Sequence, residues 1–283
     1  VDRRTLNNGN LILEDVPEIP KELFLDLFRY QNIRAAAFRA WTADSKSLYV
    51  STGFGDVDSI HRVDMPLGAR RQLTFYDEPV AGISRQPGGP QMLFSRDSGG
   101  SEFAQLFVFD PDTGEAEMIT DGESRNGATV WDRRGSRIAF QSTRRNGASN
   151  DIWVMDPEDP ASAESVLESP DGTWWGPAEF SGSGGKLLAV NYVSVTDSRI
   201  HMVDLDSGEA ALVAGGPDSP SVNSPIAFDD SNDGFWLLTD QGREFQALAW
   251  QSNEPGSAPE IITADIPWDV DGATISEDRE RMA

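Results

Sequence analysis

The chain has 283 residues, of which 38% are hydrophobic, so it can bury a large core as one big all-β domain or as two smaller domains. With 47 acidic and 23 basic residues its net charge is −24, which would repel nucleic acid and anionic membranes, and neither is expected as a partner. Cysteine is absent, which excludes disulfide bonds and thiolate metal sites. These features do not determine the cellular compartment, although the cytoplasm is favoured over the periplasm.

Residues 1–34 form an extension that differs from the rest of the chain. A short strand is predicted at 11–13, followed by the proline-stiffened connector VPEIP and a helix over 21–31. The helix is amphipathic, because its apolar residues fall at helical spacing: Leu23, Phe24, Leu27 and Phe28. We expect this apolar stripe to pack against the main domain.

From residue 35 onward one pattern recurs, and it is clearest in residues 127–156. A short apolar strand at 128–131 is followed by a turn and by a strand at 137–142 that alternates polar and apolar residues. Asn146-Gly147 suits a tight hairpin, and a third strand begins at Asp151. These features predict a unit of consecutive antiparallel strands.

The unit repeats at intervals of 42, 48, 49, 48 and 47 residues, measured between the large residues that end each first strand: Trp41, Ile83, Trp131, Phe180, Phe228 and Ile275. Third strands align at 59–64, 104–110, 151–156, 199–204 and 245–250. Short fourth strands align at 71–75, 117–121, 165–169, 211–215 and 260–264. Four strands in each 40 to 50 residues are typical of a β-propeller blade.

The predicted fold is therefore an all-β propeller of four-stranded antiparallel blades, with five full repeats and the start of a sixth. The expected blades span about 35–79, 80–126, 127–175, 176–223 and 224–271, and a partial blade covers 272–283. The first strands carry small residues, as expected where strands converge around a channel. A truncated propeller exposes strand edges, so self-association through open blade edges is expected.

Four carboxylates recur at the end of the third strand, once in each of the first four blades: Asp64, Asp110, Asp156 and Asp204. This recurrence favours capping of the following turn over metal ligation. The segment from Asp229 to Asp233 superficially resembles a calcium loop but lacks the glycine and distal glutamate at the required places. We therefore expect no metal and no cofactor.

Several segments resemble the amino-terminal propeller of the prolyl oligopeptidase superfamily of serine peptidases: NLILEDVPEIP, FRYQNIRAAAF, GFGDVDSIHRVD, RRQLTFYDEPV, DGESRN and RNGASNDIWVMD. The closest likeness is to the acylaminoacyl-peptidase and dipeptidyl-peptidase-like branch, and the blades resemble those of TolB. The resemblance implies a propeller that caps a carboxy-terminal α/β-hydrolase domain and limits which peptides reach a buried site. That domain and the peptide substrate are the partners it implies.

The catalytic machinery of that family does not appear in these 283 residues. No serine has glycine both two residues before and two after it, as a nucleophile elbow requires, and SGSGG (181–185) comes nearest. The two histidines, His61 and His201, occupy the same repeat position and are interpreted as scaffold. The chain is thus expected to be a non-enzymatic, substrate-gating module. The alternatives are a free-standing TolB-like interaction propeller and, with less support, a lectin-like sugar-binding propeller.

Contact residues are sought where the repeat offers no explanation. Arg125, Arg144 and Arg145 lie in loops between blades or at blade edges, and arginine suits bidentate recognition of a carboxylate. Their alternative role is salt bridging within a blade. Trp174 and Trp175, at a crossing between blades, are candidates for contact with a peptide or partner domain, with core packing as the alternative.

Overall fold

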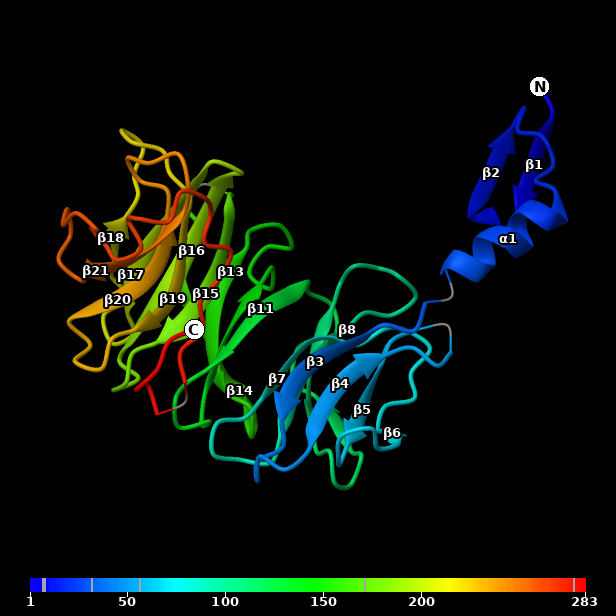
Figure 1. Cartoon of the computed structure of the whole chain (residues 1–283), viewed down its shortest axis with the longest axis horizontal. Coiled ribbons are helices and arrows are strands. Elements are labelled where there is room, and N and C mark those ends of the chain that lie inside the picture. The colour runs from blue at the N-terminus through cyan, green and yellow to red at the C-terminus, as the bar shows by residue number, and fades with distance from the viewer. Residues whose placement is uncertain (7–8, 32, 56, 171, 277) are drawn as a thin grey trace.

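The computed structural model describes residues 1–6, 9–31, 33–55, 57–170, 172–276 and 278–283. The described chain contains one helix, one two-stranded sheet and five four-stranded antiparallel sheets (Figure 1). This composition confirms the predicted all-β fold.

In each four-stranded sheet the strands follow one another in chain order. Sheet by sheet they are β3 (Ala36–Trp41), β4 (Leu48–Thr52), β5 (Ser59–Val63) and β6 (Arg70–Gln72); β7 (Ala81–Arg85), β8 (Met92–Arg96), β9 (Gln105–Phe109) and β10 (Ala116–Met118); β11 (Asn126–Trp131), β12 (Ile138–Ser142), β13 (Asp151–Asp156) and β14 (Asp159–Leu167); β15 (Trp174–Phe180), β16 (Lys186–Ser194), β17 (Asp197–Asp204) and β18 (Ala210–Ala214); β19 (Asn223–Phe228), β20 (Gly234–Thr239), β21 (Ala247–Ser252) and β22 (Glu260–Ile261).

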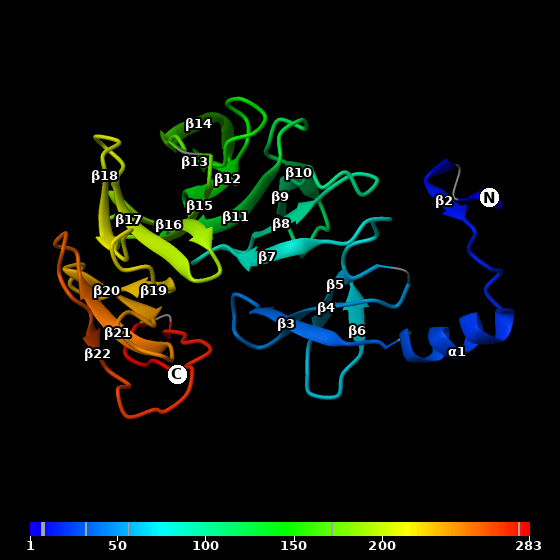
Figure 2. The ribbon, with the colours of Figure 1, turned by 90° about the horizontal axis from the view of Figure 1, so that it is seen from above.

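The five sheets are the blades of a propeller, here called blades 1 to 5. Their first strands lie side by side in the order β3, β7, β11, β15, β19, and Figure 2 shows the blades following one another around a centre. The ring is open between the first and fifth blades (Figure 2). Blades 3, 4 and 5 begin at β11, β15 and β19, one or two residues before the starts expected from the sequence.

A separate apolar core fills each of the four junctions between consecutive blades. Along β8, Met92 and Phe94 pack toward blade 1 while Leu93 packs toward blade 3, because side chains of a strand alternate between its two faces. The same layering joins blades 3 and 4, and blades 4 and 5. The second strands of blades 2, 3 and 4 therefore bury apolar side chains on both faces, which holds the array together.

Two local features repeat at the first strand. Every first strand carries a β-bulge in the few residues before or around its anchor, where the small residues cluster. A polar side chain just after the anchor caps the next turn by accepting a backbone amide hydrogen bond. These residues are Thr42, Asp132, Ser181, Asp229 and Ser276.

The C-terminal segment repeats the beginning of a blade. Ile275 bridges Met282 in antiparallel fashion, and the backbones of Thr274 and Ala283 exchange two hydrogen bonds of 2.9 and 3.0 Å. Because Ser276 caps its turn as Thr42, Asp132, Ser181 and Asp229 do, the residues described in 274–276 and 278–283 form the opening hairpin of the repeat.

The helix α1 (Lys21–Gln31) has the predicted bounds, but its expected packing against the main domain is wrong. Its apolar residues are about half exposed, it has no buried residue, and Figures 1 and 2 show it standing clear of the blades. An amphipathic pattern specifies which side chains need cover but not what covers them. The strand β2 (Leu11–Glu14) pairs with β1 (Arg3–Leu6), which the sequence did not predict, and not with a blade.

The fourth strand of blade 3 was predicted too short. β14 begins at Asp159, six residues before the predicted start, and includes Pro160. The proline is tolerated because β14 is the outer edge of its sheet, where a residue without an amide hydrogen breaks no ladder hydrogen bond.

Candidate functional site

The strand order gives the propeller two faces. The crossing face carries the loops between second and third strands and the crossings from one blade to the next, and the turn face carries the other connections. The five predicted contact residues lie in the β10–β11 and β12–β13 connections or at the start of β15, so all of them belong to the crossing face.

Arg145 is committed to its own blade. Its Nε and Nη2 donate to the two carboxylate oxygens of Asp151 at 2.7 and 3.0 Å, a bidentate pair. Asp151 is fully buried and also accepts the amide of Ser169 at 2.8 Å. The geometry is that of the salt-bridging alternative, and it anchors the β12–β13 loop.

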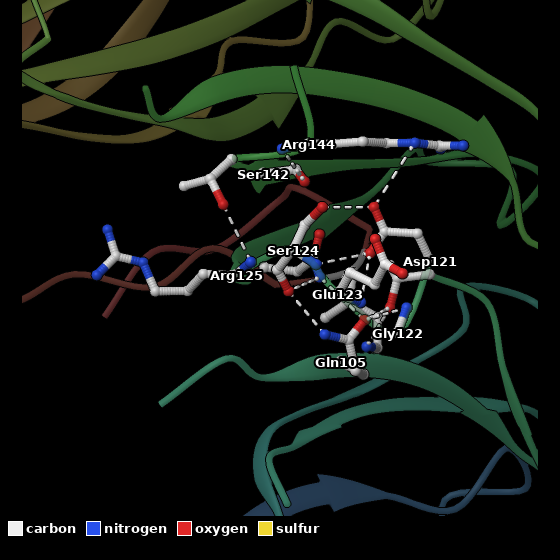
Figure 3. Close-up of polar contacts among 12 residues, drawn as sticks. Gln105, Asp121, Gly122, Glu123, Ser124, Arg125, Ser142 and Arg144 are labelled. Atoms are coloured by element: carbon white, nitrogen blue, oxygen red, sulfur yellow. Dashed lines mark hydrogen bonds and ion pairs between the residues drawn. The ribbon is translucent and has the colours of Figure 1, made fainter. Parts of the chain in front are cut away.

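Arg144 joins blade 3 to the end of blade 2. Its Nε lies 3.8 Å from Asp121 Oδ2 (Figure 3). Its guanidinium lies 5.4 Å from the ring centre of Trp153. Burial alone would raise the pKa of Asp121, but hydrogen bonds from the hydroxyl and amide of Ser124 and from the amide of Glu123 outweigh it and lower that pKa. Since its side chain is 43% exposed, Arg144 is accessible to a ligand.

The backbone of Arg125 belongs to a repeated latch. Its amide donates to Thr143 Oγ1 and its carbonyl accepts from the Thr143 amide, both at 3.0 Å. Val222 and Asp240 make the same two contacts in blade 5, two blades further along the chain. The Arg125 guanidinium donates to Asn150 Oδ1 at 3.3 Å and points away from that of Arg144, so the structure does not bring these two charges together (Figure 3).

The two tryptophans at the start of β15 have different surroundings. Trp175 is 4% exposed, packs in the core between blades 3 and 4, and lies 4.6 Å from the His201 ring. Trp174 is 39% exposed, and its ring lies against Gly176, where a Cβ would come within 2.4 Å of it. Of the pair, Trp174 is the surface residue. Contact of these residues with a peptide or partner stays a prediction.

The sequence analysis missed an apolar surface beside Trp174. Tyr192 pairs across the strands with Trp174, and the β16–β17 hairpin exposes Val193 and Val195. A pocket of about 330 Å³ opens between this hairpin and blade 5, with Tyr192 and Val195 on one side and Pro225 on the other. We call this site the hairpin pocket. The segment NYVSVTDS signals it, because apolar residues continue past the length of an ordinary second strand.

The hairpin pocket also offers polar groups at its base. Ser198 and Asn223 line it, and hydrogen bonds between them join blades 4 and 5: the Ser198 hydroxyl donates to Asn223 O at 2.9 Å. Apolar walls with a few fixed polar groups are typical of small-ligand sites.

A second site missed from the sequence lies on the turn face around Glu179. Glu179 precedes the anchor Phe180, where the other blades have Ala40, Gly82, Val130 and Ala227. Its carboxylate accepts the Phe228 amide at 2.5 Å, pairs with Arg279 of the C-terminal hairpin, and lies 3.8 Å from Arg133 Nη2. One carboxylate thus connects blades 3, 4 and 5 to the C-terminal hairpin.

Burial raises the pKa of Glu179 above its ordinary value of 4.5, although Arg279, the Phe228 amide and Arg133 all oppose this. The signal in the sequence is GPAEF, a charge directly before an anchor. The sequence does not show that this carboxylate is partly buried beside Arg279 and Arg133, so its role could be recognised only in the folded chain.

The repeated carboxylates behave as predicted in three blades. Asp110, Asp156 and Asp204 each accept an amide two residues on, at 2.8, 2.9 and 3.2 Å. Asp64 instead accepts from Arg62 at 2.6 Å and from Ser47 at 3.0 Å. His61 is 1% exposed, and one ring nitrogen lies 3.0 Å from Ser59 O, as expected of a scaffold residue. Within the described ranges, no helix is long and apolar enough to cross a membrane.

Comparison with known proteins places this geometry among known propellers. No family model matches the chain. The uncharacterized protein Atu1656 of Agrobacterium fabrum is 29% identical over 110 residues, which are 36% of this chain and 36% of that protein. A prolyl endopeptidase structure superposes over 86% of this chain and 38% of its own, with 14% identity and a TM-score of 0.66.

Other solved structures share the architecture. The oligogalacturonate lyase of Vibrio parahaemolyticus matches 88% of this chain and 70% of its own, with 13% identity and a TM-score of 0.67. TolB of Acinetobacter baumannii matches 78% and 55%, with 18% identity and a TM-score of 0.51. The fold is a β-propeller of the prolyl-oligopeptidase and TolB type. At these identities the likeness shows the fold alone, and the chain spans only 36 to 38% of the curated relative and of the prolyl endopeptidase.

Proposed function

We propose that this propeller is a substrate-gating module for a prolyl-oligopeptidase-type serine peptidase, and that it binds peptides without cleaving them. The observation that carries the proposal is the superposition of 86% of the chain on a prolyl endopeptidase, together with the family-like segments in its first three blades. The catalytic partner would be an α/β-hydrolase domain outside these 283 residues.

The crossing face supplies the chemistry for a peptide. The hairpin pocket, with a volume of about 330 Å³, has room for an apolar side chain, and Trp174 and Tyr192 extend its apolar rim. Tyrosine and tryptophan give large contact areas at low entropic cost, which suits recognition of short peptides. The side chains of Ser198 and Asn223 at the base bond to each other's backbone and to Thr239, so they fix the shape of the pocket floor.

The absence of a nucleophile elbow in the sequence supports the non-catalytic part of the proposal. Ser181 and Ser183 form the β15–β16 turn, where the Ser181 hydroxyl caps the Lys186 amide at 3.0 Å. The nearest equivalent of the motif is therefore used as a blade turn.

The test is incubation of the chain with chromogenic acyl-amino-acid and dipeptide substrates, alongside labelling with a fluorophosphonate. We expect neither turnover nor label. Turnover accompanied by fluorophosphonate labelling would refute the proposal that the chain lacks a serine nucleophile.

The second candidate is a TolB-like interaction propeller, favoured by the likeness to TolB and by the aromatic surface at Trp174 and Tyr192. The reading frame beyond codon 283 separates the two. A Gly-x-Ser-x-Gly elbow there supports the peptidase module, and a stop codon after one or two further blades supports the interaction propeller.

A further inference from the structure

An arginine-lined pocket on the turn face is unexplained by the repeat. It has a volume of about 120 Å³ and lies between the β11–β12 turn, which contributes Arg133, Arg134 and Arg137, and residues 181–184 of the β15–β16 turn. We call it the arginine pocket. It is distinct from the hairpin pocket, which lies on the crossing face.

The equivalent grooves between other blades have different chemistry. Between blades 1 and 2 the groove contains Asp44 and Asp112 with a single arginine, Arg62. Between blades 2 and 3 it contains Asp156 and Glu158 and no arginine. A groove between neighbouring blades is therefore a property of the fold, whereas the three arginines are particular to the groove between blades 3 and 4. This cluster of arginines is notable in a chain of net charge −24.

Two of the three arginines have donors to spare. Arg133 Nε and Nη2 are buried without a hydrogen-bond partner, and the carboxylate closest to Nη2, Glu179 at 3.8 Å, already binds Arg279. Burial, and then the charge of Arg279, lower the pKa of Arg133, as expected of an undercompensated cation. Arg134 is exposed and has no ion pair with any residue that the structure describes.

Arg137 fixes the pocket wall. Its Nη2 donates to Gly184 O at 2.5 Å, and its Nε lies 3.7 Å from Asp132 Oδ2. Asp132 is itself saturated, because it accepts the amide of Ser136 at 2.8 Å and the hydroxyl of Ser136 at 2.9 Å. The carboxylate in the pocket is thus committed to the turn, and the charge of Arg133 is balanced only in part by Glu179, Asp229 and Asp230.

The opposite wall lets the guanidinium groups approach the backbone. A Cβ on residue 182 would come within 2.8 Å of Arg133 Nη1, and one on residue 184 within 2.6 Å of Arg137 Nη2. Gly184 also has a φ of +77°, which favours glycine. The hydroxyls of Ser181 and Ser183, 3.2 Å apart, also lie at this wall.

We propose that the arginine pocket binds a small oxyanion, either phosphate or a carboxylate. Guanidinium groups match both anions in bidentate geometry, and the pocket volume fits a small ion with a few waters rather than a sugar or a peptide. Ligation of the anion joins the first turns of blades 3 and 4.

Isothermal titration calorimetry with inorganic phosphate, and separately with acetate, tests the site at an ionic strength held constant with sodium chloride. We expect one of the two anions to bind, and Arg134→Gln to weaken its binding at least tenfold. Arg71→Gln, the same charge change at an exposed position of β6, should leave binding unchanged. Tighter binding of phosphate or of acetate identifies the source of the oxyanion. Wild-type heats no larger than those of chloride, or equal affinities of the two variants, would overturn the proposal.

Discussion

At the scale of single residues, comparing equivalent positions of the blades distinguishes residues that hold the blades together from residues found in one blade only. Arg145 and the backbone of Arg125 are explained by contacts within or between blades. Glu179 is an exception, because it introduces a partly buried carboxylate where other blades have Ala, Gly or Val. Its three contacts tie neighbouring blades to the C-terminal hairpin, so its protonation should affect stability.

We predict that Glu179 makes stability depend on pH. Its pKa is raised above 4.5 in the folded chain, so between 4.5 and that raised value the folded state binds more protons than the unfolded state. Stability must then fall as the pH rises through this window. Glu179→Gln resembles the protonated form and should lose this dependence in urea unfolding measured at several pH values. Parallel curves for both proteins would show that burial does not shift Glu179.

At the scale of elements, the anchors that end the first strands differ in burial. Phe180 and Phe228 are fully buried, whereas Trp41 is 53% exposed because no blade precedes blade 1 in this array. The loss of unfolding free energy on removing an anchor side chain should therefore depend on how deeply that side chain is buried and not on its size.

Phe180→Ala should therefore lower the free energy of unfolding by about 3–5 kcal/mol, because it leaves a cavity between blades 3 and 4. Trp41→Ala, although it removes a larger side chain, should cost no more than about 1 kcal/mol at its exposed position. Chemical denaturation measures both. A greater loss for Trp41→Ala would mean that blade 1 is covered in solution.

The sequence predicted elements better than their environment. Period-two alternation and the interval near 48 residues were sufficient for the blades, since both reflect backbone geometry that every blade shares. The helix was predicted to the residue, but its packing was not, because covering its stripe depends on a partner surface. For the same reason the sequence indicated Arg145 and Trp175 as candidates without showing that Asp151 and the core occupy them.

At the scale of the whole molecule, the array is open and strongly acidic. Phe38 and Trp41 on β3 are 56% and 53% exposed, and their rings stack edge to face at 6.0 Å. Ile262 and Trp268, which follow the last strand of blade 5, are also exposed. Apolar surfaces at both ends of an open ring favour association of copies, which the net charge of −24 opposes at low salt.

We predict self-association that strengthens as salt screens this charge. Sedimentation velocity should show the average mass rise with concentration, and more steeply in 0.5 M than in 0.05 M sodium chloride. The double variant Phe38→Ser with Trp41→Ser should stay monomeric further up the concentration range, while Met65→Ser, at an exposed position between β5 and β6, serves as the control. A sharp, concentration-independent monomer at both salt concentrations would count against exposed edges.

We propose that the crossing face binds peptides and leaves them intact. The most direct measurement is titration of the chain with a short apolar peptide, followed by tryptophan fluorescence, with mass spectrometry of the recovered peptide. We predict saturable binding, an unchanged peptide mass, and affinity at least tenfold weaker in Trp174→Ala with Val195→Ser. Trp268→Ala, which removes an exposed tryptophan elsewhere, should bind like the wild type. Cleavage of the peptide, or no binding by the wild-type chain, would contradict the account.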